Sequence, residues 1–193
     1  MRVFLAGATG VIGLRLVRLL VEAGHDVKGM TRTPAKVTLL TAAGVDPVVC
    51  DVFDRDAVTV AVAAARPDLV MHQLTDLPDD ASRLAASLAS HNRIRREGTA
   101  SLVAAARNAG VARLVAQSVA WELPGDSGAA VADLERLVLG YPGVVVRYGQ
   151  FYGPDTYYPG GPPAPPRIQI DAAARRTLAT LDAEPGVVTI VDP

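Results

Sequence analysis

Val3-Phe4-Leu5-Ala6-Gly7-Ala8-Thr9-Gly10-Val11-Ile12-Gly13 is the stretch that decides how this chain folds. It begins with a short apolar run that is typical of a buried strand, and the apolar periodicity of residues 11–23 predicts a helix. Three glycines at a spacing of three stand between them. Gly7 allows a sharp turn, Gly10 lets phosphate oxygens approach the main chain, and Gly13 lets the helix pack close to the strand.

A strand, a glycine turn and a helix in this order predict a nucleotide-binding site. The start of the helix would offer free N–H groups and a partial positive charge to a pyrophosphate. The spacing is G-x-x-G-x-x-G, whereas the dehydrogenase fingerprint is G-x-G-x-x-G. A turn that merely packs a helix on a sheet is the alternative. We expect the cofactor to contact the whole turn: Gly7, Ala8, Thr9, Gly10, Val11, Ile12 and Gly13.

Length and composition limit the class of protein. A chain of 193 residues, half of them hydrophobic, predicts one globular domain with at most a small appendage. The net charge of −1 gives no reason to expect nucleic acid or an anionic membrane as a partner. We find no run long enough to span a bilayer and no signal-peptide pattern, so the expected location is the cytoplasm. The single Cys50 and the scattered histidines lack ligand spacing, so no metal site is predicted.

Strands and helices are expected to alternate along the whole chain. Because the strands are apolar on both faces, this pattern predicts an α/β fold, a doubly wound parallel sheet of the Rossmann type with helices on both faces. Strands are expected at residues 26–30, 46–50, 68–74, 112–118 and 143–148, and helices at 34–43, 54–65, 81–108 and 128–139.

The end of the chain differs in composition from the rest. Residues 154–166 are rich in proline, glycine and tyrosine, which predicts an irregular loop, followed by a helix at 168–183 and a strand at 187–191. We therefore divide the chain into a nucleotide-binding part, residues 1–153, and a reduced C-terminal substrate part, residues 154–193, packed on the same domain.

The end of the second strand bears on the choice of cofactor. An acidic residue there favours NAD, whereas an arginine accommodates the 2′-phosphate of NADP. The sequence reads Gly29-Met30-Thr31-Arg32, without an acidic residue, so NADP is preferred over NAD. Thr31, Arg32 and Lys36 are the expected contacts, and solvated surface charges are the alternative for the two basic residues.

Several segments together resemble the short-chain dehydrogenase/reductase superfamily, in its extended or atypical branch, which includes the NAD-dependent epimerase/dehydratase-like proteins. The resemblance rests on the glycine turn and on four further segments that span about three quarters of the chain: Asp51-Val52, residues 98–106, residues 114–118 and residues 147–154. It implies that Asp51 and Val52 lie beside the adenine, although a turn or cap role is equally open for Asp51. It also implies further cofactor contacts from Gln73, Leu74, Thr75 and Tyr148.

The catalytic pair of that superfamily, Tyr-x-x-x-Lys, is absent. The only lysines are Lys28 and Lys36, and every tyrosine lies at position 141 or later. By alignment with the family, Ser127 and Val131 take the places of the pair, and Arg95 replaces an asparagine. The usual acid–base residues are therefore missing, and the substrate cover between residue 154 and the last helix is expected to be a loop.

Other residues are candidates for a catalytic role. Ser118 follows the fifth strand and Tyr152 follows the sixth, and both are predicted to be catalytic, with a structural tyrosine as the alternative at 152. His72 could be a base or a core histidine, and Trp121 could line a substrate pocket or pack in the core. Tyr157 and Tyr158 could close over a ligand.

Three functions remain open on this basis. The first is an NADP-dependent, carbonyl-reductase-like oxidoreductase with non-standard acid and base residues, acting on a small molecule. The second is a nucleotide-binding sensor or partner subunit without catalysis, and the third is an epimerase or dehydratase. A homodimer is possible through the helix at 81–108, although its Leu84, Leu88 and Leu102 could instead pack on the sheet.

Overall fold

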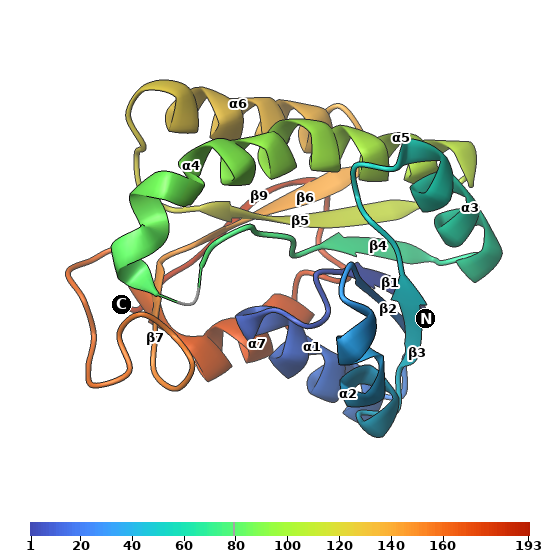
Figure 1. Cartoon of the computed structure of the whole chain (residues 1–193), viewed down its shortest axis with the longest axis horizontal. Helices are drawn as coiled ribbons and strands as arrows, with labels where there is room; N and C mark the ends of the chain where they lie inside the picture. The colour runs from blue at the N-terminus through green and yellow to red at the C-terminus, as the bar shows by residue number, and fades with distance from the viewer. Residues whose placement is uncertain (79) are drawn as a thin grey trace.

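The computed structural model describes residues 1–78 and 80–193. Its centre is a seven-stranded, fully parallel sheet with the strand order β3-β2-β1-β4-β5-β6-β9 (Figure 1). The predicted doubly wound sheet is confirmed. Its strands are β1 Arg2–Ala6, β2 Asp26–Thr31, β3 Asp46–Val49, β4 Leu69–His72, β5 Arg113–Val119, β6 Gly143–Tyr148 and β9 Gly186–Ile190.

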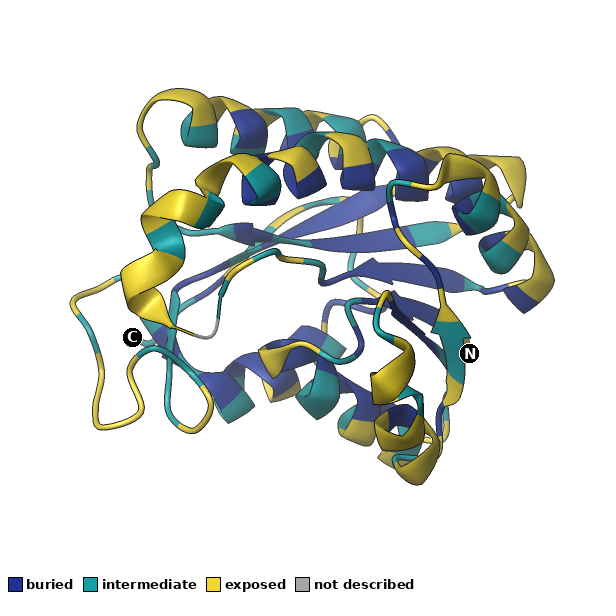
Figure 2. Cartoon of the chain, in the orientation of Figure 1, coloured by how far each residue is buried: buried dark blue, intermediate teal, exposed yellow. Residues whose placement is uncertain are grey.

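Helices cover both faces of this sheet, and Figure 1 shows the two layers. One layer holds α1 (Val11–Glu22), α2 (Val37–Ala42) and α7 (Ile170–Leu178). The other holds α3 (Arg55–Ala65), α4 (Leu84–Arg93), α5 (Thr99–Asn108) and α6 (Gly125–Leu139). Because both faces are covered, the strands are buried on both sides, as the dark blue of the central strands shows in Figure 2.

The alternation of side chains along β1 divides the core into two parts. Val3 and Leu5 belong to the cluster under α1 and α7, while Phe4 and Ala6 belong to the cluster under α3, α5 and α6. All four side chains are buried. The apolar run that begins the sequence therefore anchors both layers at once, because successive side chains of a strand point to opposite faces.

The helix predicted over residues 81–108 is one continuous run that changes its winding three times. A 3-10 turn at Ala81–Arg83 leads into α4, a π-helical turn at Ile94–Gly98 follows, and α5 continues from there. A π turn contains an extra residue, so it rotates the residues before it relative to those after it. Arg95 lies within this π turn. The apolar periodicity of the sequence does not reveal the turn.

The prediction of a helix over residues 168–183 is wrong at both ends. Arg167–Gln169 forms a short strand, β8, which pairs with β7 (Gln150–Tyr152). The helix α7 starts after this strand because the Gln169 side chain accepts a hydrogen bond from Ala172 N at 2.8 Å and caps it. The helix then packs on α1, where Arg15 pairs with Asp171 at 2.6 Å, and β9 extends the same sheet beside β6.

Candidate functional site

A cleft of about 930 Å³ lies along the carboxyl ends of the central strands. The strand order reverses between β1 and β4, and open parallel sheets bind ligands at such a point. Residues from both helical layers and from the C-terminal loop line the cleft. Of the predicted cofactor contacts, it brings together Gly7, Thr9, Gly10, Val11, Ile12, Thr31, Arg32, Lys36, Asp51, Val52, Gln73, Leu74, Thr75 and Tyr148.

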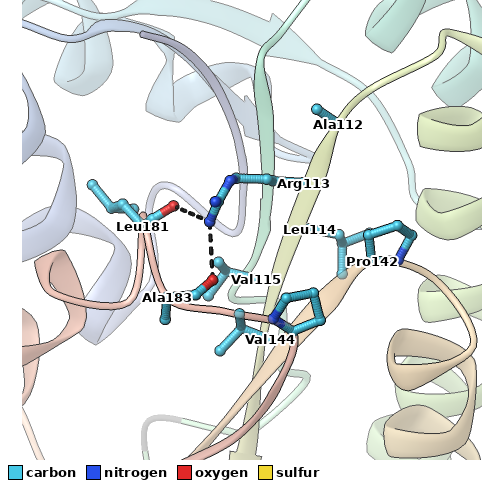
Figure 3. Close-up of a pocket in the computed structure, with 9 residues that line it drawn as sticks. Ala112, Arg113, Leu114, Val115, Pro142, Val144, Leu181 and Ala183 are labelled. Carbon is cyan, nitrogen blue, oxygen red and sulfur yellow. Dashed lines mark hydrogen bonds between the residues drawn. The ribbon is translucent and has the colours of Figure 1, made fainter.

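A second hollow, of about 140 Å³, lies at the opposite edge, where β5 and β6 begin. Figure 3 shows the Arg113 guanidinium at its wall, donating hydrogen bonds to the carbonyl oxygens of Leu181 and Ala183. Its polar lining is thereby occupied in holding the chain after α7. The larger cleft is therefore the candidate site.

The glycine turn has the geometry that a pyrophosphate needs. Gly7 has a φ of +88°, and a Cβ on Gly13 would lie 2.0 Å from the Gly7 carbonyl oxygen, so both positions require glycine. A Cβ on Gly10 would meet only that same oxygen, at 3.4 Å. No side chain caps the start of α1 at Gly10, so the helix end remains available to an anion. Ala8 and Gly13 lie behind the turn and do not line the cleft.

The rim of the cleft just after β2 carries the residues predicted to contact a 2′-phosphate. Arg32 is exposed and pairs with Asp76 at 2.5 Å, and Lys36 lies on the same rim. Burial alone would raise the pKa of Asp76, but hydrogen bonds from Ser90 and Arg32 outweigh it and lower that pKa. The side chain of Arg32 is thus held at the rim of the cleft by a carboxylate, although it remains exposed to solvent.

Asp51 has the turn role that the sequence left open, and it also lies at the cleft. Its carboxylate accepts a hydrogen bond from Phe53 N at 3.0 Å, which fixes the turn after β3, and the residue also lines the cleft beside Val52. Cys50, just before it, is buried as expected for a small hydrophobic residue.

Gln73 has a buried side chain whose polar atoms lack hydrogen-bond partners among the described residues. It is only 3% exposed, and neither its Nε2 nor its Oε1 has a hydrogen bond of good geometry within the described residues. The Tyr148 hydroxyl lies near it but bonds Thr177 Oγ1 at 2.6 Å. Burial raises the pKa of Tyr148. Since an unpaired buried amide is costly, Gln73 fits a ligand that completes its bonding.

Ser118 lies in the cleft, but its proton is already committed. Its hydroxyl donates to Glu135 Oε1 at 2.7 Å, and Arg147 donates to both oxygens of that carboxylate, at 2.8 and 2.5 Å. Burial alone would raise the pKa of Glu135, yet the hydrogen bonds from Arg147 and Ser118 outweigh it and lower the pKa. A carboxylate held ionised in this way leaves Ser118 with lone pairs, not a proton, toward the cleft.

Tyr152 is not among the residues that line the cleft. Its hydroxyl donates to Asp192 Oδ2 at 2.9 Å, and this bond raises the pKa of the tyrosine. This position fits the alternative of a structural tyrosine, because the side chain at the end of β7 bonds a residue near the C-terminal end of the chain. Tyr157 and Tyr158 do line the cleft, and the Tyr157 hydroxyl donates to Pro78 O across it.

The histidines differ in their surroundings. His72 is fully buried, receives a hydrogen bond from Leu74 N on Nδ1 and bonds Thr99 Oγ1 through Nε2 at 2.9 Å. Burial lowers its pKa to about 4, so it is a neutral core histidine. His91 lines the cleft and has a pKa lowered to about 4 by burial and by the neighbouring Arg95.

One face of the α4 segment escaped the sequence analysis. Leu84, Leu88, His91 and Arg95 recur at helical spacing and all line the cleft, as do Trp121 and Leu123. Trp121 is therefore part of the wall, whereas Leu102 packs in the core. The 4-3-4 spacing was the available signal, but the residues differ too much in polarity to form a recognisable stripe.

Two searches of the described residues bear on other classes of function. Residues 1–78 and 80–193 contain no group of three or more potential metal ligands that could hold an ion. Within the same residues, none of the helices is long and apolar enough to cross a bilayer.

The fold and the glycine turn define a Rossmann-type nucleotide-binding protein. The chain belongs to the NAD(P)H-binding family, whose model matches residues 7–136. Its fold is that of the NAD-dependent epimerase/dehydratase proteins, the extended short-chain dehydrogenases/reductases. A UDP-glucose 4-epimerase of Thermotoga maritima superimposes with a TM-score of 0.80 at 18% identity, over 99% of this chain and 77% of the epimerase. The UDP-glucose 4-epimerase of Thermus thermophilus, solved with NAD, gives 0.79 at 21% identity, over 99% of this chain and 78% of that one.

Relatives found by sequence are named for activities other than epimerisation. A Streptomyces protein named 3-diazoavenalumate denitrifying reductase is 44% identical over 185 aligned positions, covering 82% of this chain and 59% of the relative. A 3-beta-hydroxysteroid dehydrogenase of Mycolicibacterium neoaurum is 33% identical over 116 positions, covering 59% of this chain and 31% of the dehydrogenase. The chain thus spans about three fifths of the first relative's length and less of the second.

Proposed function

We propose that this chain is an NADPH-dependent reductase whose substrate accepts a hydride without a proton donor from the protein. The observation that carries the proposal is a cleft beside the glycine turn in which the hydroxyl groups that could act as acids already donate hydrogen bonds to the protein. Ser118 donates a hydrogen bond to the ionised Glu135, Tyr148 bonds the buried Thr177, and Tyr152 bonds Asp192 outside the cleft. Tyr157 and Tyr158 also line the cleft, and their hydroxyls donate to Pro78 O and Gln150 Oε1. A carbonyl substrate would need a proton on its oxygen as the hydride arrives.

The residues present fit the cofactor. The turn around Gly10 and the open start of α1 would receive the pyrophosphate, and the orphaned amide of Gln73 would bond a polar group farther along. Arg32 and Lys36 would hold the 2′-phosphate of NADP, with Arg32 exchanging Asp76 for it. The bound cofactor supplies the hydride, and the protein positions the acceptor.

The name of the Streptomyces relative describes a substrate with a diazo group and a reductive loss of nitrogen. This chemistry suits a cleft in which Ser118 and the tyrosine hydroxyls already donate hydrogen bonds. An arenediazonium ion is cationic, so addition of a hydride to its terminal nitrogen gives a neutral diazene. The diazene then loses its N–H proton to water, the carbon–nitrogen bond breaks with release of N₂, and the ring carbon takes a proton from water, so that hydrogen replaces N₂ on the ring. We propose arenediazonium or diazo compounds as the substrate class.

The test is the oxidation of NADPH, followed at 340 nm, with a diazotised aminohydroxycinnamate and with a panel of aldehydes and ketones. We expect turnover of the diazo compound, with release of N₂, and none of the carbonyl compounds. Arg32→Ala should weaken NADPH by about 10-fold or more but NADH hardly at all, because it removes a charge-assisted phosphate contact. A reaction without protein measures the spontaneous reduction.

Other outcomes lead to different functions. Reduction of carbonyl compounds would contradict the proposed substrate class, while leaving a reductase. Tight NADPH binding without turnover of any acceptor would favour the sensor or partner subunit. Failure to bind either nicotinamide cofactor would remove both of these functions.

A further inference from the structure

Arg95 is a buried cation that forms no ion pair with any of residues 1–78 and 80–193. Its side chain is 8% exposed, and it lines the cleft from the π turn after α4. Its one hydrogen bond runs from Nη1 to Asn92 Oδ1, at 3.2 Å. No carboxylate among the described residues lies within ion-pairing distance of it, since none of the ion pairs there includes Arg95.

Nearby carboxylates are already used by other arginines. Asp126 accepts from Asn92 but pairs with Arg96 at 2.6 Å. Asp76, whose backbone N–H bonds His91, pairs with Arg32. His91 supplies no counter-charge either, because an imidazole is neutral or positive. Burial lowers the pKa of Arg95 to about 10, which still leaves the guanidinium charged at neutral pH.

A buried charge without an ion pair is costly, so a protein keeps one where a ligand supplies the partner. The glycine turn, where the pyrophosphate is expected, does not belong to the same helical layer as Arg95. The glycine turn belongs to the layer of α1, whereas Arg95 comes from the layer of α4 and α5 on the other face of the sheet (Figure 1). The two therefore come from opposite helical layers.

The surroundings of Arg95 describe the rest of the ligand. Leu84 and Leu88 lie on the same helical run, with Trp121 and Leu123 on the β5–α6 connection. These side chains make an apolar and partly aromatic wall beside one cation. Asn92 holds the guanidinium from behind, because its own amide is fixed by Asp126 and Ser127.

We propose that Arg95 binds a carboxylate of the substrate, so that the acceptor is an aryl or arylalkenyl carboxylate whose ring lies against Trp121. The flat guanidinium matches a carboxylate in two parallel hydrogen bonds. This inference rests on the proposed function, which it deepens by adding an anchor distant from the reacting group. Asn92 is a positioning residue for that anchor.

The test uses Trp121, the only tryptophan, as a fluorescent reporter in the cleft. The full chain is titrated with cinnamate and with cinnamamide, both with and without saturating NADP⁺. We expect saturable binding of cinnamate, at least 10-fold tighter than that of the amide. Arg95→Met should weaken cinnamate by about 10- to 100-fold and leave cinnamamide unchanged, whereas Arg107→Met, at the far end of α5, should behave as wild type.

A thermal melt of the same variants separates binding from folding. Arg95→Met should melt at or above the wild-type temperature, because it removes an uncompensated buried charge. Arg95→Lys should retain part of the cinnamate affinity. The proposal is overturned if wild type does not bind cinnamate, if it binds the amide equally well, or if Arg95→Met binds cinnamate like wild type. Calorimetry with NADPH judges the proposed function separately, since the titration without cofactor still tests Arg95.

Discussion

Gly10 and Gly13 stand in one turn but meet opposite surroundings. A methyl group on Gly13 would lie 2.0 Å from a backbone oxygen, which cannot move aside without opening the turn between β1 and α1. A methyl group on Gly10 would touch one atom at 3.4 Å, and the residue has an ordinary φ of −79°. Gly13 is thus required by the packing of the protein itself, whereas glycine at position 10 is required only by what approaches it from the cleft.

We expect this difference to separate stability from binding. Gly13→Ala should lower the free energy of unfolding by about 3 kcal/mol or more, through overpacking against backbone. Gly10→Ala should change it by less than about 0.5 kcal/mol while weakening NADPH at least 10-fold, because the methyl group occupies the approach of the pyrophosphate. Urea unfolding and calorimetry measure the two quantities. Unchanged NADPH binding by Gly10→Ala would place the cofactor elsewhere.

At the scale of elements, α7 is tied to the sheet by a buried chain of hydroxyl groups. Thr177 donates to Ala173 O within the helix at 2.7 Å, so its oxygen accepts the hydrogen bond from Tyr148 at the end of β6. Both side chains are buried. The C-terminal helix therefore reaches the floor of the cleft, although it lies outside the matched family region of residues 7–136.

This tie predicts a coupled pair of substitutions. Thr177→Val leaves the Tyr148 hydroxyl without its partner and should cost about 1–3 kcal/mol of unfolding free energy, whereas Tyr148→Phe should cost about 1 kcal/mol. The double variant should cost less than the sum of the two, because no buried hydroxyl remains unpaired. Urea unfolding of the four proteins completes the cycle, and strictly additive costs would show that the hydroxyls do not interact.

At the scale of the whole molecule, two neutral histidines link stability to pH. His72 and His91 have pKa values lowered to about 4, against 6.5 in the unfolded chain. Between these values the unfolded state binds more protons than the folded one. Stability is therefore fully present above pH 6.5 and is lost as the pH falls toward 4.

We expect a loss of about 2 kcal/mol per histidine between pH 7 and pH 5. His91→Asn, whose side-chain oxygen can still accept from Asp76 N, should remove close to half of this dependence. Urea unfolding at pH 7, 6 and 5 measures it in both proteins. A free energy of unfolding that does not change from pH 7 to pH 5 would mean that the histidines are charged in the folded state.

Local signals in the sequence were enough to predict the sheet and the side of the cleft formed by the glycine turn and the end of the second strand. The glycine turn, the alternation of strands and helices, and the end of the second strand act through neighbours in the chain, so position alone predicts them. The start of α7 was misplaced because Arg167–Gln169 becomes a strand only by pairing with Gln150–Tyr152. That pairing joins distant residues and leaves no periodicity behind.

The amino-acid sequence by itself determined the fold class and the nucleotide-binding turn, because backbone geometry and short-range apolar patterns specify both. Tertiary structure alone decided which polar groups have partners. It joined Ser118 to Glu135, turned Tyr152 away to Asp192, and placed Arg95 in the cleft with Asn92 as its hydrogen-bond partner and no ion pair among the described residues. A hydrogen bond or ion pair depends on where two distant segments meet, and that meeting is fixed only when the two helical layers close on the sheet.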